Sequence, residues 1–521
     1  MWNVKLHAIF KRVIVYVITI VAPFLLWLCL EYLANSITHR FDPLKVDKNK
    51  KTLYINQDYF NDYFVAEQER FFNTSSSNRA IHLEKKNRFR IFCLGGSTTA
   101  GYPYNTLPEY NCPASFPNYL RAILQYNRDL PEIEMLNLGS NAFNSLSLLA
   151  LFDDVKQYNP DLLIIYTGHN EYFGPNEFSL SARVSRIFNK KWVHHSMLRL
   201  RQTYLYQGLR WVIKKVAGRG IASYKNYAQW SMKNTVAFDD PIHEEVANNF
   251  RNNLSELVQR AKRQGIKVVI CTPISNLTFP PFVSQFSKKL DVAAKADWDT
   301  LRNQASRLFD QQRYDEALGV WKKIYEIDST YADVHYYIGM NFARLEEYEV
   351  ANQALTRALE LDALPFRARP KIQQICREVA QTENVILADS DWFFRQLSGK
   401  QFPEPSLMLD HVHPNEPGYY YLALFLAKTL VENGVFYGIK QIQYPSLERT
   451  REVLDIFDFV AYKVEYDFSR QSYLAQLAQL NPAVNAVVRE IGEQAIRRAR
   501  QIGEQLSKQQ QAEIEQEKEK K

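Results

Sequence analysis

Four short polar segments of the chain carry the residue types that acyl-transfer chemistry needs. The first is Gly-Gly-Ser-Thr-Thr at 95–99, which sets Ser97 after a short apolar run and a two-glycine turn. The others are Asn-Leu-Gly-Ser at 137–140, Thr-Gly-His-Asn-Glu at 167–171, and Asp-His-Val-His-Pro-Asn-Glu-Pro-Gly at 410–418. Together they offer a hydroxyl, an imidazole, a carboxylate and several N–H donors. Any one of them alone is also ordinary turn chemistry.

The chemistry of a serine sets demands that these segments can meet. A serine hydroxyl is a poor nucleophile and needs a base within hydrogen-bond reach. An imidazole acts as that base only when a carboxylate on its other nitrogen fixes the tautomer. Asp410 and His413 stand three residues apart on one tight loop, so they can adopt this geometry locally. Developing charge on the substrate oxygen needs N–H donors, which a glycine backbone and an asparagine amide can supply.

Five short apolar runs, rich in β-branched residues, are the elements that must position these segments. They alternate with helical patterns and span 90–94, 133–138, 162–167, 266–272 and 385–388. Short continuous apolar runs separated by helices predict a parallel sheet covered on both faces. The first three polar segments follow successive predicted strands. The sheet would therefore gather them at the carboxyl ends of its strands, where ligands bind in such folds.

This arrangement resembles the SGNH (GDSL-type) hydrolase superfamily, and the four segments are similar to its four signature blocks. The resemblance implies a three-layer α/β fold with a parallel, flavodoxin-like sheet, and no cofactor. It implies that Ser97 is the nucleophile, His413 the general base and Asp410 its orienting partner. It also implies an oxyanion hole made of the backbone N–H groups of Ser97 and Gly139 and the side-chain amide of Asn170.

Two departures from the family pattern leave the substrate class open. The usual Gly-Asp-Ser is here Gly-Gly-Ser at 95–97, so the aspartate is missing. The usual Gly-x-Asn-Asp is here Gly-His-Asn-Glu at 168–171, with a longer acid in the last place. Neither change removes a catalytic group. The resemblance covers roughly residues 88–435, with an interruption described below.

Competing site types fit the sequence less well. Thr99 stands where the α/β-hydrolase elbow G-x-S-x-G has its second glycine, and no lysine follows the glycines as a P-loop requires. His411 and His413 could ligate a metal, but no further His, Cys or Asp cluster has ligand spacing. The five cysteines are far apart and show no C-x-x-C pair. We therefore expect neither a metal site nor a disulfide framework.

The N-terminus predicts a membrane anchor. Val13–Leu30 is eighteen residues without a charge, just long enough to span a bilayer, and Lys5, Lys11 and Arg12 precede it. No small-x-small cleavage site follows, so we expect a retained single-pass anchor within 1–40; a buried core helix is the alternative. Basic residues flank both ends of the run. The short N-terminal flank favours a body outside the cytoplasm, on the periplasmic side of a bacterial inner membrane.

Residues 298–366 interrupt the strand–helix alternation. They are helical throughout and repeat with a period of 34, which relates Tyr314 to Tyr348 and Ala317 to Ala351. The period and pattern resemble tetratricopeptide repeats, which bind protein partners; an ordinary helical hairpin is the alternative. The expected domains are thus an anchor (1–40), a lead-in (41–87), a hydrolase domain in two parts (88–297 and 367–440), the repeats (298–366), and a helical region with a charged tail (441–521).

A basic stretch follows the third polar segment. Between Glu177 and Asp239 there is no acidic residue but twelve Lys and Arg, interleaved with aromatic residues. The whole chain has 64 basic and 57 acidic residues, so without these twelve the balance would be 52 against 57. Such a stretch suits an anionic membrane surface, and a solvated helix pair is an equal alternative. Nucleic acid is not expected, because no nucleic-acid motif accompanies the basic residues.

From the sequence we predict a membrane-anchored, extracytoplasmic serine esterase that acts through an acyl-enzyme on Ser97. The resemblance makes O-acyl groups of carbohydrate or envelope material the favoured substrates, and lipid esters stay open. If a sugar hydroxyl replaced water, the same site would be an O-acyltransferase. A different class also stays open, in which the chain is a membrane-anchored scaffold with a vestigial hydrolase fold.

Overall fold

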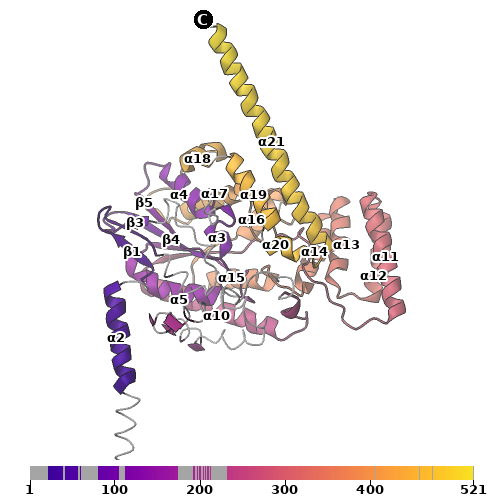
Figure 1. The fold of residues 1–521 in the computed structure, drawn as a ribbon, viewed down its shortest axis with the longest axis horizontal. Coiled ribbons are helices and arrows are strands. Elements are labelled where there is room, and N and C mark those ends of the chain that lie inside the picture. The colour runs from indigo at the N-terminus through magenta and orange to yellow at the C-terminus, as the bar shows by residue number, and fades with distance from the viewer. Residues whose placement is uncertain are drawn as a thin grey trace, which may run out of the picture.

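A five-stranded parallel sheet forms the centre of the protein (Figure 1). The computed structural model describes residues 22–38, 42–56, 59, 80–104, 112–173, isolated positions between 192 and 212, and 231–519 apart from 404, 457 and 472. The spatial order of the strands is β5-β4-β6-β7-β8, and each neighbouring pair is parallel. This confirms the five predicted strands, which are β4 (Phe89–Gly95), β5 (Ile133–Asn137), β6 (Leu162–Tyr166), β7 (Lys267–Cys271) and β8 (Ile386–Ala388).

Helices cover both faces of this sheet, because alternate residues of each buried strand point to opposite sides. Phe92 and Leu94 pack with one set of helices, α5 (Ser145–Val155), α10 (Ile242–Arg263) and α15 (Pro370–Thr382). Ile91 and Cys93 pack with the other set, α4 (Phe116–Gln125) and α17 (Glu416–Glu432). All four strand residues have no exposed surface. The result is a three-layer α/β domain; a short 3-10 turn, η4 (Lys156–Tyr158), follows α5.

The lead-in segment contains a second, small sheet that the sequence patterns did not predict. Its three antiparallel strands are β1 (Leu44–Asp47), β2 (Thr52–Ile55) and β3 (Ala80–His82). Their apolar side chains join the core cluster of α5 and α10. Arg90 of the central sheet ties the small sheet in place, because its guanidinium donates to Glu134 Oε2 (2.8 Å) and to the His82 carbonyl (2.9 Å).

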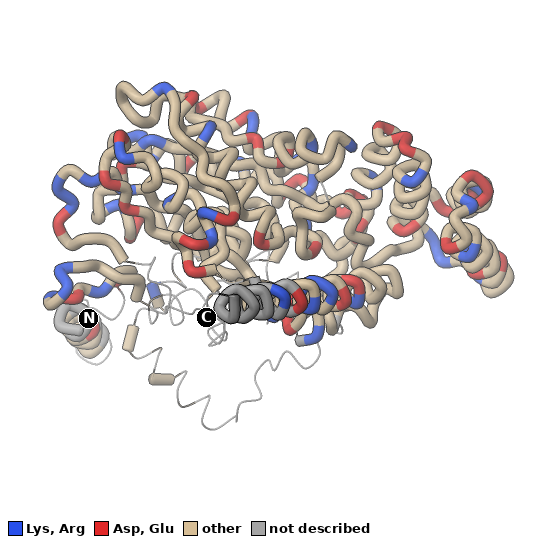
Figure 2. The backbone as a smooth tube through the Cα atoms, turned by 90° about the horizontal axis from the view of Figure 1, so that it is seen from above, with Lys and Arg blue, Asp and Glu red and all other residues tan. Residues whose placement is uncertain are grey.

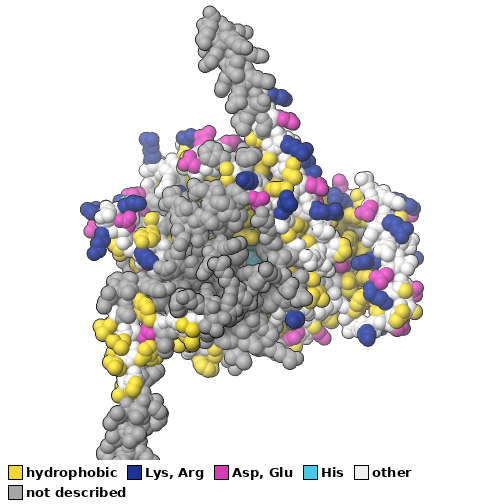
Figure 3. Space-filling model, viewed as in Figure 1, with side chains coloured by type: hydrophobic (Ala, Val, Ile, Leu, Met, Phe, Trp, Pro, Cys, Tyr) yellow, Lys and Arg dark blue, Asp and Glu magenta, His cyan; other side chains and the backbone are white. Residues whose placement is uncertain are grey.

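The described N-terminal helix is α2 (Ala22–Thr38). Leu25, Leu26, Leu30 and Leu33 on this helix are each more than half exposed, and Figure 3 shows hydrophobic side chains gathered there. Within the stretches that the structure describes, no helix combines the length and apolarity needed to cross a bilayer. The first part of the predicted anchor and most of the basic stretch lie outside the described residues.

Two helical hairpins are inserted between β7 and β8. They are α11 (Val292–Asp310) with α12 (Tyr314–Ile327), and α13 (Ala332–Arg344) with α14 (Tyr348–Leu361), so the helical segment begins six residues before its predicted boundary. Trp298 and Trp321 fill the core of the first hairpin, and the Trp321 ring stacks on Tyr337 of the second at 4.7 Å. The hairpins and α2 lie at opposite ends of the molecule (Figures 1 and 2).

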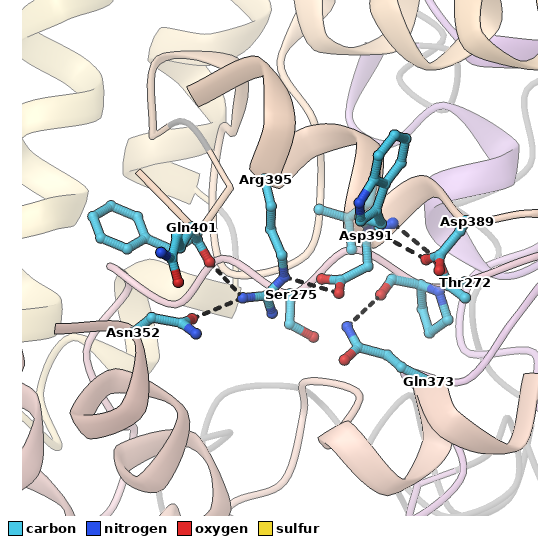
Figure 4. Close-up of polar contacts among 12 residues, drawn as sticks. Thr272, Ser275, Asn352, Gln373, Asp389, Asp391, Arg395 and Gln401 are labelled. Carbon is cyan, nitrogen blue, oxygen red and sulfur yellow. Dashed lines mark hydrogen bonds and ion pairs between the residues drawn. The ribbon is translucent and has the colours of Figure 1, made fainter. Parts of the chain in front are cut away.

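A polar cluster fixes the hairpins to the sheet domain (Figure 4). Arg395 of α16 (Ser390–Ser398) donates to Asn352 Oδ1 of α14 (2.7 Å), to the Gln401 carbonyl (2.7 Å) and to Asp391 Oδ2 (2.9 Å). The backbone N–H of Asp391 in turn donates to Thr272 Oγ1, one residue beyond β7 (2.9 Å). A single guanidinium therefore joins the second hairpin to the edge of the central sheet.

The C-terminal region is helical, as predicted. Its elements are α18 (Leu447–Leu454), α19 (Asp458–Gln471), α20 (Tyr473–Leu477) and α21 (Pro482–Glu519). The first part of α21 packs closely on α19, since a Cβ at Gly492 would lie 2.7 Å from Ser469 Oγ. The rest of α21 projects away from the body (Figure 1), and Figure 2 shows acidic and basic residues along the part of α21 nearer to the body.

Candidate active site

The sheet brings the four predicted polar segments together at the carboxyl ends of its strands. Ser97 begins the short helix α3 (Ser97–Ala100) directly after β4. The second and third segments follow the neighbouring strands β5 and β6. The fourth lies between the 3-10 turn η8 (Pro405–Leu407) and α17, and a bridge between Met408 and Pro414 closes its loop.

Ser97, His413 and Asp410 form one line of hydrogen bonds. His413 Nε2 lies 2.7 Å from Ser97 Oγ, and His413 Nδ1 lies 2.7 Å from Asp410 Oδ2. Asp410 and His413 are 1% and 3% exposed, whereas Ser97 is partly open to solvent. With a proton on Nδ1 that is held by the carboxylate, the imidazole presents Nε2 to the serine as an acceptor.

The loop around Asp410 holds its carboxylate ionised. Asp410 Oδ1 accepts the backbone N–H groups of Val412 (2.8 Å) and His413 (2.7 Å). Burial alone would raise the pKa of this carboxyl, but the neighbouring imidazoles of His413 and His411 and the loop hydrogen bonds outweigh burial and hold the pKa well below its usual range. Asn276 fixes the loop from behind, because its Nδ2 donates to the Asp410 carbonyl (3.0 Å).

Two other histidines near the site are neutral packing residues. His411 lies against the Phe282 ring at 4.9 Å between centroids, and burial lowers the pKa of its imidazole to about 3. His169 accepts the Ala368 N–H on Nδ1 (3.1 Å), and burial lowers the pKa of its imidazole to about 3 as well. Among the described residues, no three His, Cys, Asp or Glu side chains are grouped so that they could hold a metal ion.

The Asn170 amide lies beside the turn that carries Ser97. Its Nδ2 donates to the Phe143 carbonyl (3.0 Å), which leaves its second N–H for another acceptor. A Cβ at Gly96 would come within 2.8 Å of this Nδ2. Gly96 has φ −86°, which any residue adopts, so backbone freedom is not the reason for a glycine at this position. The reason is the space that the Asn170 amide occupies. An aspartate, the family's usual residue here, would need that space.

Gly139 does not have the free N–H that the resemblance assigns to it. Its N–H donates to Asn137 Oδ1 inside the loop (3.0 Å). The glycine is needed for packing, because a Cβ there would lie 2.3 Å from the backbone nitrogen of Ala100. Ala142, further along the same loop, has φ 61°, a left-handed conformation that is uncommon for a residue with a Cβ. Its N–H has no acceptor in the part of the chain that the structure describes.

Glu171 fastens the third loop to the start of α5. Its carboxylate accepts the N–H of Ser145 (2.9 Å) and the Ser145 hydroxyl (2.7 Å). Burial raises the pKa of Glu171 to about 7. The side chain thus holds the loop that carries Asn170, at some distance from the serine.

The chain was compared with known proteins. Residues 93–313 match the model of the GDSL-like Lipase/Acylhydrolase family. The match spans 221 of the 521 residues, and this part of the chain is similar to GDSL-like hydrolases. Proteins of this type are ester hydrolases, and this chain is an enzyme of that class. The match ends before Asp410 and His413, which lie beyond the inserted hairpins. A comparison with curated proteins found no relative.

Solved structures resemble part of this chain at low identity. The lipase/acylhydrolase from Enterococcus faecalis is 13% identical over 68% of this chain and 98% of its own, with a TM-score of 0.30. The acetylxylan esterase Axe2 from Geobacillus stearothermophilus is 12% identical over 66% of this chain and 92% of its own, with a TM-score of 0.28. At TM-scores this low, the resemblance bears on neither the substrate nor the site.

Proposed function

We propose that this hydrolase cleaves O-acyl esters through Ser97, with His413 as general base and Asp410 as its orienting carboxylate. The observation that carries the proposal is the line of two 2.7 Å contacts from Asp410 through His413 to Ser97. A scaffold with a vestigial site has no reason to keep a buried carboxylate, an imidazole and a solvent-reached hydroxyl in this line. The proposed substrates are O-acyl groups on carbohydrate or envelope material.

In the proposed mechanism, His413 Nε2 takes the proton from Ser97 Oγ as that oxygen attacks the ester carbonyl carbon. The carbonyl oxygen becomes an oxyanion, which the Ser97 N–H and the free Asn170 N–H stabilise. Each such donor contributes about 3–4 kcal/mol to the transition state.

Collapse of the tetrahedral intermediate breaks the bond to the alcohol, which leaves with the proton held on His413. A water molecule then gives its proton to His413 and attacks the acyl group, and Ser97 regains its proton as the carboxylic acid departs. If the hydroxyl of a sugar attacks instead of water, the product is a new ester and the enzyme is an O-acyltransferase. The same residues serve both outcomes.

The test uses p-nitrophenyl acetate and a fluorophosphonate probe on the purified chain. Wild-type protein should hydrolyse the ester and bind one probe covalently, and Ser97→Ala should do neither. Ser329→Ala, an exposed serine in the hairpins, is the matched control and should behave like wild type. A wild type that neither hydrolyses nor labels would favour the scaffold, and labelling that survives Ser97→Ala would show that the nucleophile is another residue.

A panel of esters separates the substrate classes. Release of acetate from acetylated saccharides, with little activity on long-chain p-nitrophenyl esters, would support carbohydrate substrates. The reverse order of activity would favour lipid esters. Addition of an oligosaccharide acceptor that converts the released acyl group into a new sugar ester would identify the transferase.

We also propose that the N-terminal run anchors the enzyme in a bilayer, with the body on the extracytoplasmic side. The exposed leucines of α2 support this, because three of them belong to the uncharged run and Leu33 follows it closely. The Tyr204 N–H in the basic stretch donates to Glu31 Oε2 of α2 (2.6 Å), which is where a membrane-facing basic segment would sit. Flotation with vesicles tests the anchor and the basic stretch. Full-length chain should float with any vesicle, and a chain starting at residue 41 should float only with anionic vesicles.

The repeat interpretation of the inserted hairpins is likewise a proposal. It is supported by the four consecutive helices and by the close contact of α13 with α14 at the small residue Gly339. Placed at the end remote from α2, the hairpins would be accessible to a protein partner while the enzyme is anchored.

A further inference from the structure

The C-terminal helix α19 contacts the strip of chain that follows the nucleophile. Glu465 Oε1 accepts the hydroxyl of Tyr104 (2.6 Å), and the Phe468 ring packs edge-on against Tyr102 at 5.6 Å between centroids. Glu465 and Phe468 are three positions apart, so they share one face of the helix. Tyr102 and Tyr104 come only five and seven residues after Ser97. A helix far away in the sequence therefore lies directly behind the active-site turn.

The other side of the same strip contacts the loop that carries His413. The Tyr102 ring lies 4.9 Å from the His413 imidazole between centroids. The Tyr104 hydroxyl accepts the backbone N–H of Glu416, three residues after His413 (3.1 Å). Both tyrosines thus contact α19 and also the histidine loop.

Buried charges tie three C-terminal helices into this arrangement. Glu465 and Glu416 are 3% and 2% exposed. Arg451 of α18 pairs with Glu416, and Arg498 of α21 lies 3.5 Å from Glu465. Each pair joins a buried carboxylate to a partly exposed guanidinium, 17% exposed for Arg451 and 33% for Arg498, and so links the two helices that carry these groups. This network fixes α19 against the Tyr102–Tyr104 strip.

We propose that α19 is part of the catalytic apparatus, in which Glu465 and Phe468 are positioning residues that act on His413 through Tyr104 and Tyr102. The inference rests on the proposed function of Ser97 and His413. The C-terminal helices lie beyond the residues that the family model matches. In this proposal they hold the imidazole at the distance and angle that proton transfer needs. A shift of about 1 Å in such a group can cost on the order of 100-fold in rate.

The experiment compares variants of the full chain on p-nitrophenyl acetate and by the rate of fluorophosphonate labelling. Glu465→Ala and Phe468→Ala should lower kcat about 10- to 100-fold, with KM within about twofold of wild type. Glu465→Gln, which still accepts a hydrogen bond from Tyr104, and Phe468→Leu, which keeps an apolar contact, should recover most of kcat. Arg470→Ala, on the exposed side of the same helix, is the matched control.

Thermal melts separate positioning from loss of fold. Rates normalised to the folded fraction should still be low in the alanine variants. If folded Glu465→Ala and Phe468→Ala proteins turn over at the wild-type kcat, the inference is refuted. A failure of the proposed function would be seen differently, because then the wild type itself would neither hydrolyse the ester nor label at Ser97.

Discussion

Gly96→Ala should disable the Asn170 donor without disturbing the fold. The backbone at Gly96 has φ −86°, which alanine adopts freely. The added Cβ would lie 2.8 Å from Asn170 Nδ2, and the next nearest atom, the Phe143 carbonyl oxygen, is at 3.4 Å. The clash therefore falls on one side-chain amide. That amide must retreat, and its retreat moves it out of the oxyanion site.

The size of the effect follows from the distance. Ordinary contact begins at 3.4 Å, so the amide must move by about 0.6 Å or more. Complete removal of an oxyanion donor costs about 10²–10³ in kcat, and misplacement by about 1 Å costs on the order of 100-fold. We expect kcat for Gly96→Ala to fall roughly 30- to 100-fold, with KM little changed. Asn170→Ala removes the donor completely and sets the limit, so its kcat should fall by a factor of about 10²–10³.

The assay is steady-state hydrolysis of p-nitrophenyl acetate by wild type, the two single variants and the double variant. Because both changes act on one amide, Gly96→Ala should have almost no further effect in the Asn170→Ala background. Gly319→Ala is the matched control, since a Cβ there meets no atom within 4 Å, and it should retain full activity.

Two results would refute the reasoning. A Gly96→Ala enzyme with wild-type kcat would mean that the amide is not needed where the structure has it. Losses that multiply in the double variant would mean that the new methyl group acts on something other than Asn170.

Three further predictions concern the carboxylates and the hairpins. Asp410→Asn should lower kcat about 10³–10⁴-fold, because an amide favours the wrong histidine tautomer; a smaller loss in the ester assay would contradict this role. Burial raises the pKa of Glu171 from 4.5 to about 7, so the folded state holds a proton that the unfolded state loses. The free energy of unfolding should therefore fall as pH rises from about 4.5 to 7, at up to about 1.4 kcal/mol per pH unit. Between pH 5 and pH 8, the melting temperature of Glu171→Gln should drop less than that of the wild type. An equal drop would exclude Glu171 as the cause. Gly339→Ala would put a Cβ 2.7 Å from Leu355 Cγ and should destabilise the hairpins by about 1–3 kcal/mol in denaturant titration, with ester hydrolysis unchanged.

Much of the hydrolase domain could be predicted because each central strand is a short, wholly apolar run. β6, Leu-Leu-Ile-Ile-Tyr, can only be buried on both faces, which requires a parallel sheet with helices on either side. Once the strands are placed, the topology itself brings Ser97 and Asn170 to one edge. The Asp410–His413 pair depends only on spacing within a single loop, so it too is readable from the chain.

What could not be predicted depends on contacts between distant segments. The small sheet of β1, β2 and β3 has strands of three or four residues, too short for a clear alternation of polar and apolar positions. Gly139 looked like an oxyanion donor because a glycine can free an N–H, but the loop uses that N–H internally. The contacts of Tyr102 and Tyr104 with α19 join residues more than 360 positions apart in the sequence, and no local pattern predicts them.

The order of the segments along the chain also sets when Ser97 and His413 first coexist during synthesis. The two residues are 316 positions apart, and the hairpins from Val292 to Leu361 account for 70 of these positions. A ribosome adds about 5–20 residues per second, so Ser97 emerges roughly 15 to 60 s before His413 exists. Over that interval the nascent chain holds a serine with no partner to activate it. If the N-terminal run directs the chain to a membrane, the order of the segments delays ester hydrolysis until the chain has reached its destination.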